Sequence, residues 1–337
     1  TTIALTGDAL SGGAKYQSSV AVGTIIYFTP YTQHNVGRLA AAPSGSIGDP
    51  HLTFADGGTA DFRGVSGAVF AFLAVVGLQV NVMTTARSFR RWGGQIVHGS
   101  FITRAFLHIR SAKTGAVFCV ALFAEHFDRF RLYQDCNAPA AGELGYYNKT
   151  RFEHPGLEVM QMSGGRTYVH ANGFEFFVRR RRVARPIFRD DETQSLAGCV
   201  PAPDSKFKWC FFLDTSFRVL DGDADMVTKF GKSTIGTVAP HGIIGQSFDG
   251  SKLAVSGKQD DYGNGPEFTT SAQAEGAIEG TYKDYLVTTP FGTTFKYGRF
   301  DATVPIPPRN VSALAGMKTK AVPGVTAGSI ELHGTEA

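Results

Sequence analysis

Short segments in which residues of two kinds alternate constrain the fold of this chain more than any other feature. In "FITRAFLHIRS" one face of a strand carries Phe101, Thr103, Ala105, Leu107 and Ile109, and the other carries Arg104, Phe106, His108 and Arg110. Only one face can be buried, so we expect the Arg-bearing face to meet water. Asp-Gly, Thr-Gly and Asn-Gly pairs at 56–57, 114–115 and 172–173 supply hairpin turns.

The composition agrees with a chain made of many short strands. Among 337 residues there are 40 glycines, 15 prolines and 27 phenylalanines, and only 18% are charged. Glycine and proline favour turns, and aromatic side chains fill the space between two sheets. We therefore predict an all-β antiparallel sandwich with little helix.

Three segments can be distinguished along the chain: 1–43, 44–302 and 303–337. Residues 15–40 contain two strand-like runs, "SSVAVG" and "TIIYFTP", and resemble one repeat of the Kelch-like arrays of algal and other protist surface proteins. A single repeat cannot form a propeller, so we expect a remnant hairpin followed by a linker. Residues 303–337 have no aromatic residue and several prolines, which predicts an extended tail outside the sandwich.

Two motifs carry a family resemblance. "GDPHLTFADGGTADFRG", residues 48–64, resembles the first strands of von Willebrand factor type D domains. "PHGIIGQSFDG", residues 240–250, resembles their closing loop and a phrase in the C-terminal domain of inter-alpha-trypsin inhibitor heavy chains. The likeness extends to residue 302 and is greatest to algal and dinoflagellate-type extracellular proteins in which this domain follows Kelch-like repeats.

The resemblance also implies a calcium site, and it has one departure. Animal type D domains close on two cysteines, but His241 and Ile244 stand at those positions, so disulfide-linked polymerisation is not implied. Their closing loop binds calcium, which prefers oxygen ligands. The matching residues here are Gln246, Asp249, Asp260 and Asp261. The alternative is that these residues are solvated polar loop residues.

The Asp49-Pro50-His51 sequence raises the question of self-cleavage. An Asp carboxyl can attack its own backbone carbonyl and expel the proline nitrogen, with His51 helping to protonate that nitrogen. Some members of both resembled families are cut or joined to partners at this bond. Our expectation is structural: Pro50 sets φ and begins the first strand, and His51 is a hydrogen-bonded core residue. Self-cleavage is the alternative.

The cysteines indicate an oxidising compartment. Four of them permit three pairings, and none stands in a C-x-x-C unit that would favour zinc. We expect Cys199–Cys210, because the residues between them can turn back as a hairpin, and Cys119–Cys136 as the other pair. Asn148 and Asn310 begin glycosylation sequons, and the chain lacks an initial Met, as a processed product would. We predict a secreted, cell-surface, matrix or flagellar-surface location.

The strongest charge feature is "RRRRVARPIFR", residues 179–189. Arg179, Arg181 and Arg185 could hold an acidic polysaccharide through forked contacts, or the run could be a solvated edge strand. The net charge of +4 is too small for a dedicated nucleic-acid binder. No apolar run reaches 18 residues, so no membrane span is predicted.

No motif of a known enzyme class is present: we find no nucleophile elbow, no His-Glu-x-x-His helix and no paired histidine ligands. The sequence therefore predicts a non-enzymatic extracellular structural or adhesive module. We expect it to belong to a larger homo- or hetero-assembly and to bind other proteins or glycans. The alternative function is a self-cleaving module that cuts at Asp49-Pro50. Calcium is the one cofactor that the resemblance implies.

Overall fold

A computed structural model describes the chain at residues 16–22, 25–30, 37–39, 44–91, 93–136, 143–147, 151–183, 186–187, 199–201, 208–251 and 253–309. The chain divides into two compact units, Thr1–Ala42 with Lys320–Ala337, and Pro43–Thr319. The described strands of the first unit form an antiparallel sheet of β1 (Tyr16–Val22), β2 (Ile25–Pro30) and β3 (Gly37–Leu39). The likeness of this sheet to a Kelch repeat stays a prediction.

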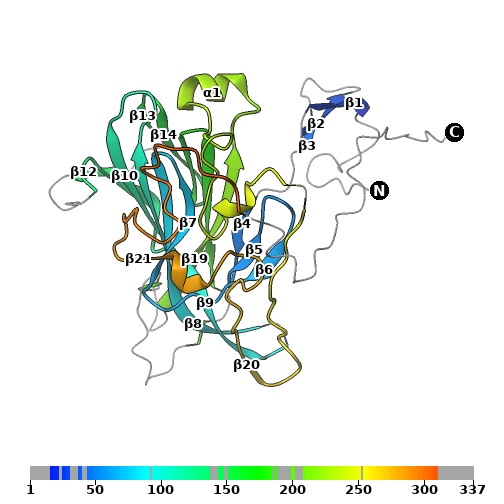
Figure 1. Ribbon diagram of the computed structural model, residues 1–337. Coiled ribbons are helices and arrows are strands. Elements are labelled where there is room, and N and C mark those ends of the chain that lie inside the picture. Colours follow the sequence, from blue (N-terminus) through cyan, green and yellow to red (C-terminus); the bar gives the residue numbers. More distant parts are fainter. Residues whose placement is uncertain are drawn as a thin grey trace. The chain divides into compact units, whose positions relative to one another are not determined.

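The second unit holds two large sheets (Figure 1). The first sheet has the order β12-β11-β10-β9-β8-β7-β21, with β17 beside β8 and β20 beside β9. Its strands are β7 (Val69–Val75), β8 (Leu78–Arg90), β9 (Ile96–Arg110), β10 (Val117–Phe123), β11 (His126–Tyr133), β12 (Glu143–Tyr147), β17 (Pro186–Ile187), β20 (Glu267–Thr269) and β21 (Leu286–Val287).

The second sheet has the order β13-β14-β15-β16-β19-β4-β5-β6, with β18 beside β19. Its strands are β4 (Ser44–Ile47), β5 (His51–Thr53), β6 (Thr59–Asp61), β13 (Arg151–His154), β14 (Leu157–Met162), β15 (Arg166–Ala171), β16 (Phe174–Arg182), β18 (Cys199–Pro201) and β19 (Lys208–Val219). Three short helices complete the described structure: α1 (Ala224–Phe230), η2 (Gly245–Ser247) and η3 (Tyr282–Tyr285).

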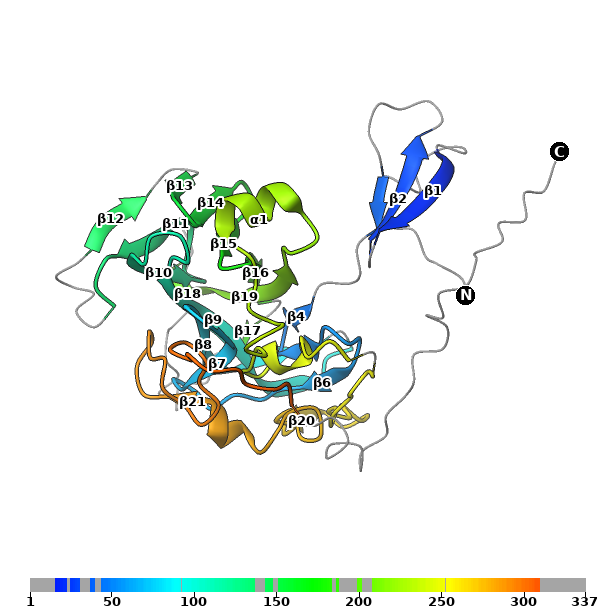
Figure 2. The ribbon, with the colours of Figure 1, turned by 45° about the horizontal axis from the view of Figure 1, so that its top comes forward.

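The two sheets pack against each other around a shared apolar core (Figure 2). Phe72 and Leu107 enter it from the first sheet, and Phe176 and Phe217 enter it from the second; all four are almost fully buried. Each such side chain contributes roughly 1.5–3 kcal/mol by leaving water. The pairings between the described strands are antiparallel, except that β20 runs parallel to β9. The predicted all-β antiparallel sandwich is confirmed.

The outer face of β9 differs from the prediction. We expected its Arg-bearing face to meet water, but Phe106 on that face is only 5% exposed. Phe291 packs on it with 5.5 Å between ring centroids, and the carbonyl oxygen of Phe291 lies 3.0 Å from Nδ1 of His108. Asn81 also donates to the carbonyls of Pro290 and Gly292. The expectation was wrong for Phe106, because a segment about 190 residues further along covers it. The side chains of Arg104 and Arg110 do meet water and are 32% and 42% exposed.

A bulge in β9 changes which residues share a face. Met83 of β8 is opposite Arg104, but Thr84 is opposite Ile102, so Thr103 is the extra residue. Ile102 therefore joins the main core, while Phe101 belongs to a separate cluster. The prediction that Phe101 shares a face with Ala105, Leu107 and Ile109 was wrong for this reason.

The chain after residue 302 docks on the sandwich as far as it is described. Ile306 pairs with Val238, and its backbone N–H donates to Thr237. The guanidinium of Arg309 lies between the buried carboxylates of Asp56 and Asp249, at 2.8 and 2.9 Å. The rest of the predicted tail lies outside the described residues.

Both predicted disulfides are present. Cys119 is bonded to Cys136 across 17 positions, and Cys199 to Cys210 across 11 positions. Cys199 and Cys210 face each other on β18 and β19, as the hairpin argument requires. Disulfides persist in oxidising compartments, so they favour an extracellular or secreted protein. Among the described residues, no helix is long and apolar enough to cross a membrane.

Candidate functional site

The Asp49-Pro50 bond lies in the turn between β4 and β5, which are antiparallel neighbours in the second sheet. Gly48 begins the turn with φ +70°, a backbone conformation that residues with a Cβ rarely adopt. Its backbone N–H donates to Oδ1 of Asp214. The carbonyl oxygen of Pro50 accepts from the N–H of Phe62. The backbone is therefore anchored on both sides of the bond.

The side chain of Asp49 reaches the backbone of the other sheet. On the side of β9 away from β8, β20 pairs with residues 96–98 and β10 with residues 104–110. Between these two partners, the N–H of Ser100 donates to Oδ1 of Asp49 at 2.8 Å. Oδ2 of Asp49 is buried and has no hydrogen-bond partner within the described part of the chain. The carboxyl thus fills a gap in the strand pairing and leaves one oxygen unpaired.

Burial changes the protonation of this carboxyl. Asp49 is only 8% exposed. Loss of hydration raises its pKa to about 7, and the Ser100 N–H and the nearby His51 lower it only partly. Asp49 therefore keeps its proton up to neutral pH, whereas an ordinary Asp loses its proton near pH 4.

Gly99 provides the space that this carboxyl occupies. A Cβ at residue 99 would lie 2.2 Å from Oδ2 of Asp49, closer than any real contact. Only glycine allows β9 to pass beside the carboxyl in this arrangement.

His51 is paired with a carboxylate on the next strand. Its Nδ1 lies 2.6 Å from Oδ1 of Asp61, which is directly opposite it in the β5–β6 pairing. This hydrogen bond is the main cause that raises the pKa of His51 above its ordinary value. Oδ2 of Asp61 accepts from the N–H of Asp260. Nε2 of His51 lies 3.5 Å from the hydroxyl of Tyr262, whose pKa burial raises.

The expectation that His51 is a core residue was wrong. Its side chain is 51% exposed, although it is hydrogen-bonded as expected. The reason is the two-residue period of β5, which directs Leu52 into the core and His51 outward.

A cavity of about 360 Å³ lies beside these residues. We call it the Asp49 cavity. Apolar and aromatic side chains line it together with polar and charged ones, which include Asp49 and His51. Its lining residues are Gly48, Asp49, His51, Phe89, Arg91, Phe101, Arg182, Val183, Phe212 and Tyr262. Phe101 lies here because of the bulge in β9, packed between Phe89 and Phe212.

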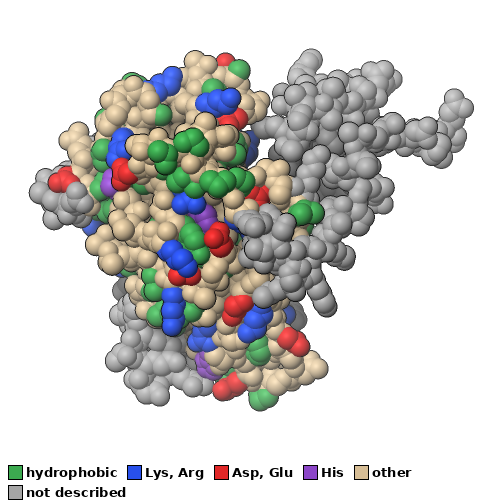
Figure 3. All heavy atoms as spheres, in the orientation of Figure 1, with side chains coloured by type: hydrophobic (Ala, Val, Ile, Leu, Met, Phe, Trp, Pro, Cys, Tyr) green, Lys and Arg blue, Asp and Glu red, His purple; other side chains and the backbone are tan. Residues whose placement is uncertain are grey.

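The predicted arginine site is only partly described. Arg179 and Arg181 lie on β16, and Nε of Arg181 donates to Asp214 at 3.0 Å. Arg185 lies outside the described residues. The alternate arginines Arg180 and Arg182 cover the rings of Phe211 and Trp209, as cations over aromatic faces do. On the face drawn in Figure 3, basic and acidic side chains are interspersed.

Two of the predicted calcium ligands have other partners. Gln246 is buried; its amide nitrogen donates to the hydroxyl of Tyr285, and its amide oxygen accepts from the N–H of Glu279. Oδ2 of Asp249 accepts from Arg309. These contacts hold the loop at 240–250 against the segment that ends at Arg309.

The other two predicted ligands accept backbone hydrogen bonds. Asp260 accepts from the N–H groups of Ser271 and Ala272, and Asp261 accepts from that of Gly263. Each carboxylate thus has a partner without an ion, and the calcium site stays a prediction.

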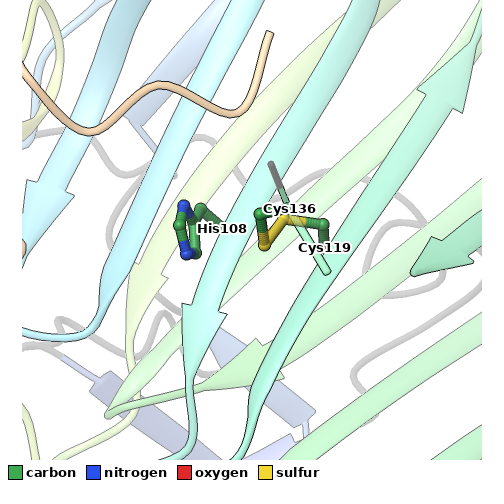
Figure 4. A group of neighbouring side chains, drawn as sticks. All are labelled: His108, Cys119 and Cys136. Atoms are coloured by element: carbon green, nitrogen blue, oxygen red, sulfur yellow. A yellow bond between two sulfur atoms is a disulfide. The ribbon is translucent and has the colours of Figure 1, made fainter. Parts of the chain in front are cut away.

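One group of side chains elsewhere has the spacing of metal ligands. Within the described ranges, His108, Cys119 and Cys136 are the group of three whose ligand atoms lie within 4.8 Å of one another (Figure 4). The two sulfurs are bonded to each other, so neither is a thiolate that could bind a metal. Burial lowers the pKa of His108, and its Nδ1 faces the carbonyl of Phe291. This group is a packed disulfide with a neutral imidazole beside it.

His241 and Ile244, which replace two cysteines of the resembled domains, are both buried. Burial lowers the pKa of His241 to about 3, so its imidazole is neutral. It stacks on Tyr297 with 4.3 Å between ring centroids. Both positions are therefore filled by packing. Asn148 and Asn310, the predicted glycosylation sites, lie outside the described residues.

Sequence reasoning missed several residues that complete the site, namely Asp61, Gly99, Ser100 and Tyr262. A signal for Asp61 existed, because a hairpin centred on residue 56 places residues 51 and 61 opposite each other. Gly99, Ser100 and Tyr262 come from distant segments, and no local pattern connects them to Asp49.

No protein-family model matches the chain, and no curated protein matches it.

Proposed function

We propose that this protein is a secreted, disulfide-bonded β-sandwich module, resembling a type D domain, that cuts its own backbone between Asp49 and Pro50. The observation that supports this is the buried Asp49 carboxyl, which keeps a proton up to about pH 7 and has one oxygen without a hydrogen-bond partner. An unpaired oxygen is available as a nucleophile, and the proton is what the leaving nitrogen needs.

The proposed reaction needs no reactant other than water. A carboxyl oxygen of Asp49 attacks the backbone carbonyl carbon of the same residue and closes a five-membered cyclic anhydride. The C–N bond to Pro50 breaks, and the nitrogen takes the carboxyl proton and leaves as a secondary amine. Water then opens the anhydride, which gives one fragment ending at Asp49 and one beginning at Pro50.

His51 supports this step as a proton carrier. Its hydrogen bond to Asp61 raises its pKa, so the imidazolium persists to higher pH than that of an ordinary histidine. An imidazolium next to the Pro50 residue can supply or relay the proton to the leaving nitrogen. The half-exposed ring can then recover its proton from solvent.

Intact mass tests the proposal directly. Folded protein kept at pH 6 should yield the two fragments, and protein kept at pH 8.5 should yield far less of them. Asp49→Asn should stay whole at both values, because an amide lacks the nucleophile and the proton. The matched control is Asp261→Asn, an exposed carboxylate that accepts one backbone hydrogen bond. A wild-type chain that stays whole at pH 6 would contradict the proposal.

A second candidate function is a non-enzymatic adhesive module that binds an acidic glycan or protein within a larger assembly. The Asp49 cavity favours it, because Arg91 and Arg182 line the cavity beside aromatic side chains. Binding to a sulfated polysaccharide should then weaken severalfold in Arg91→Gln and Arg182→Gln, and not in Lys296→Gln, which pairs with Asp284. Equal binding by all three variants would contradict this function.

A further inference from the structure

Strand β4 is the first strand of the second unit in the sequence, yet it lies in the interior of the second sheet. Ser44, Gly45 and Ser46 pair with Phe217, Ser216 and Thr215 of β19. On its other side, residues 45–47 pair with Thr53, Leu52 and His51 of β5. Pairing on both sides fixes the register of β4 more firmly than an edge position would.

Side chains add specificity to this pairing. The hydroxyl of Ser46 lies 3.2 Å from that of Thr215, and the hydroxyl of Ser44 donates to the carbonyl of Phe217. Ser44 and Ser46 are 2% and 1% exposed. A Cβ at Gly45 would lie 1.9 Å from the carbonyl oxygen of Thr215, so the strands approach too closely for any larger residue. The position between β19 and β5 therefore selects a narrow strand with small polar side chains.

The bond between Asp49 and Pro50 lies just outside this pairing. Cutting it breaks no hydrogen bond between β4 and its neighbours. The hydrogen bond from the N–H of Ser100 to the Asp49 side chain then joins the two fragments. All four cysteines come after residue 49, so no disulfide joins the two fragments.

We infer that the space between β19 and β5 is a strand-binding site whose occupant is segment 44–49 of this chain. After scission, fragment 1–49 stays bound there without a covalent link. The mature protein is then a two-chain complex held by strand pairing, with no disulfide between its chains. This inference rests on the proposed scission for its physiological role, but strand binding is a property of the fold alone.

Co-expression of residues 1–49 with residues 50–337 tests strand binding without scission. A tag on the short fragment should recover the long one at about equal molar amounts, and the pair should separate only in denaturant. Gly45→Val in the short fragment should reduce recovery at least tenfold. The matched control is Ile47→Ala, because Ile47 is 61% exposed and its loss should leave recovery unchanged.

Three outcomes would overturn the inference: a folded long fragment that is not recovered, equal recovery with Gly45→Val, or a long fragment that aggregates even beside the wild-type short one. Failure of the proposed function looks different. In that case the full-length chain stays whole at pH 6, while the co-expressed fragments still form the complex. If instead the full-length chain is cut and its fragments separate under native conditions, scission stands and the strand-binding inference falls.

Discussion

Replacing Asp49 by Asn should stabilise the folded chain at high pH more than at low pH. The ordinary Asp pKa is 3.8 and that of buried Asp49 is about 7, so the difference is about 3. Each pKa unit corresponds to about 1.4 kcal/mol, so ionised Asp49 costs the fold about 4 kcal/mol. Asp49 is almost fully buried, and solvent therefore screens little of this cost.

The sign follows from proton binding. The folded chain holds the Asp49 proton more tightly than the unfolded chain does, so the stabilisation is complete below about pH 4 and is lost as the pH rises through 7. Between pH 5.5 and 8.5 the wild type should lose about 2 kcal/mol relative to Asp49→Asn. The new amide oxygen can still accept from Ser100, and any cost of its NH₂ group is the same at each pH.

Urea unfolding of both proteins at a series of pH values measures this difference, with intact mass recorded for each sample so that only uncut chains are compared. The contributions of all other carboxylates to the pH dependence cancel in this difference, because both proteins contain them. Asp261→Asn, as the control, should show no such trend. A difference between the wild type and Asp49→Asn that is constant from pH 5.5 to 8.5 would refute the argument that burial keeps Asp49 protonated.

The pH dependence of scission and two further substitutions have clear expected outcomes. The rate of scission should rise as the pH falls and reach half its maximum near pH 7, where Asp49 gains its proton; mass spectrometry against pH measures it, and a midpoint near pH 4 would mean an ordinary carboxyl. Gly99→Ala should displace the Asp49 carboxyl, slow scission and cost roughly 1–3 kcal/mol, whereas Gly236→Ala, where nothing lies within 4 Å of the added Cβ, should do neither. Arg309→Met should cost roughly 3–5 kcal/mol in urea unfolding because it leaves two buried carboxylates unpaired, and a loss as small as that of exposed Lys296→Met would contradict this.

The features that sequence predicted correctly are local ones. The Cys199–Cys210 bond followed from two cysteines on adjacent strands of a hairpin. The two-sheet class followed from alternation and turn pairs, which are properties of a few neighbouring residues. Alternation also located β9, but it could not show the bulge at Thr103, because a bulge depends on the register with β8.

The features that sequence missed depend on distant contacts. Phe106 is buried by Phe291, and no pattern in either segment signals the other. The same holds for Asp49, because its position in a turn gave no sign of burial. Its environment comes from Gly99 and Ser100 on the other sheet, which became neighbours only when the sandwich closed. The motif thus identified the residue, and the tertiary fold determined its protonation.

Stability and reactivity at Asp49 change in the same direction with pH. Protonation below about pH 7 removes the cost of a buried charge, and it also provides the proton that the Pro50 nitrogen needs. Scission that accelerates on mild acidification therefore would not require the fold to loosen. This property distinguishes the proposed scission from simple acid hydrolysis of the one Asp-Pro bond in the chain, because acid hydrolysis needs no folded environment. Denaturant should consequently slow the proposed reaction at pH 6, because unfolding returns Asp49 to an ordinary, ionised carboxylate.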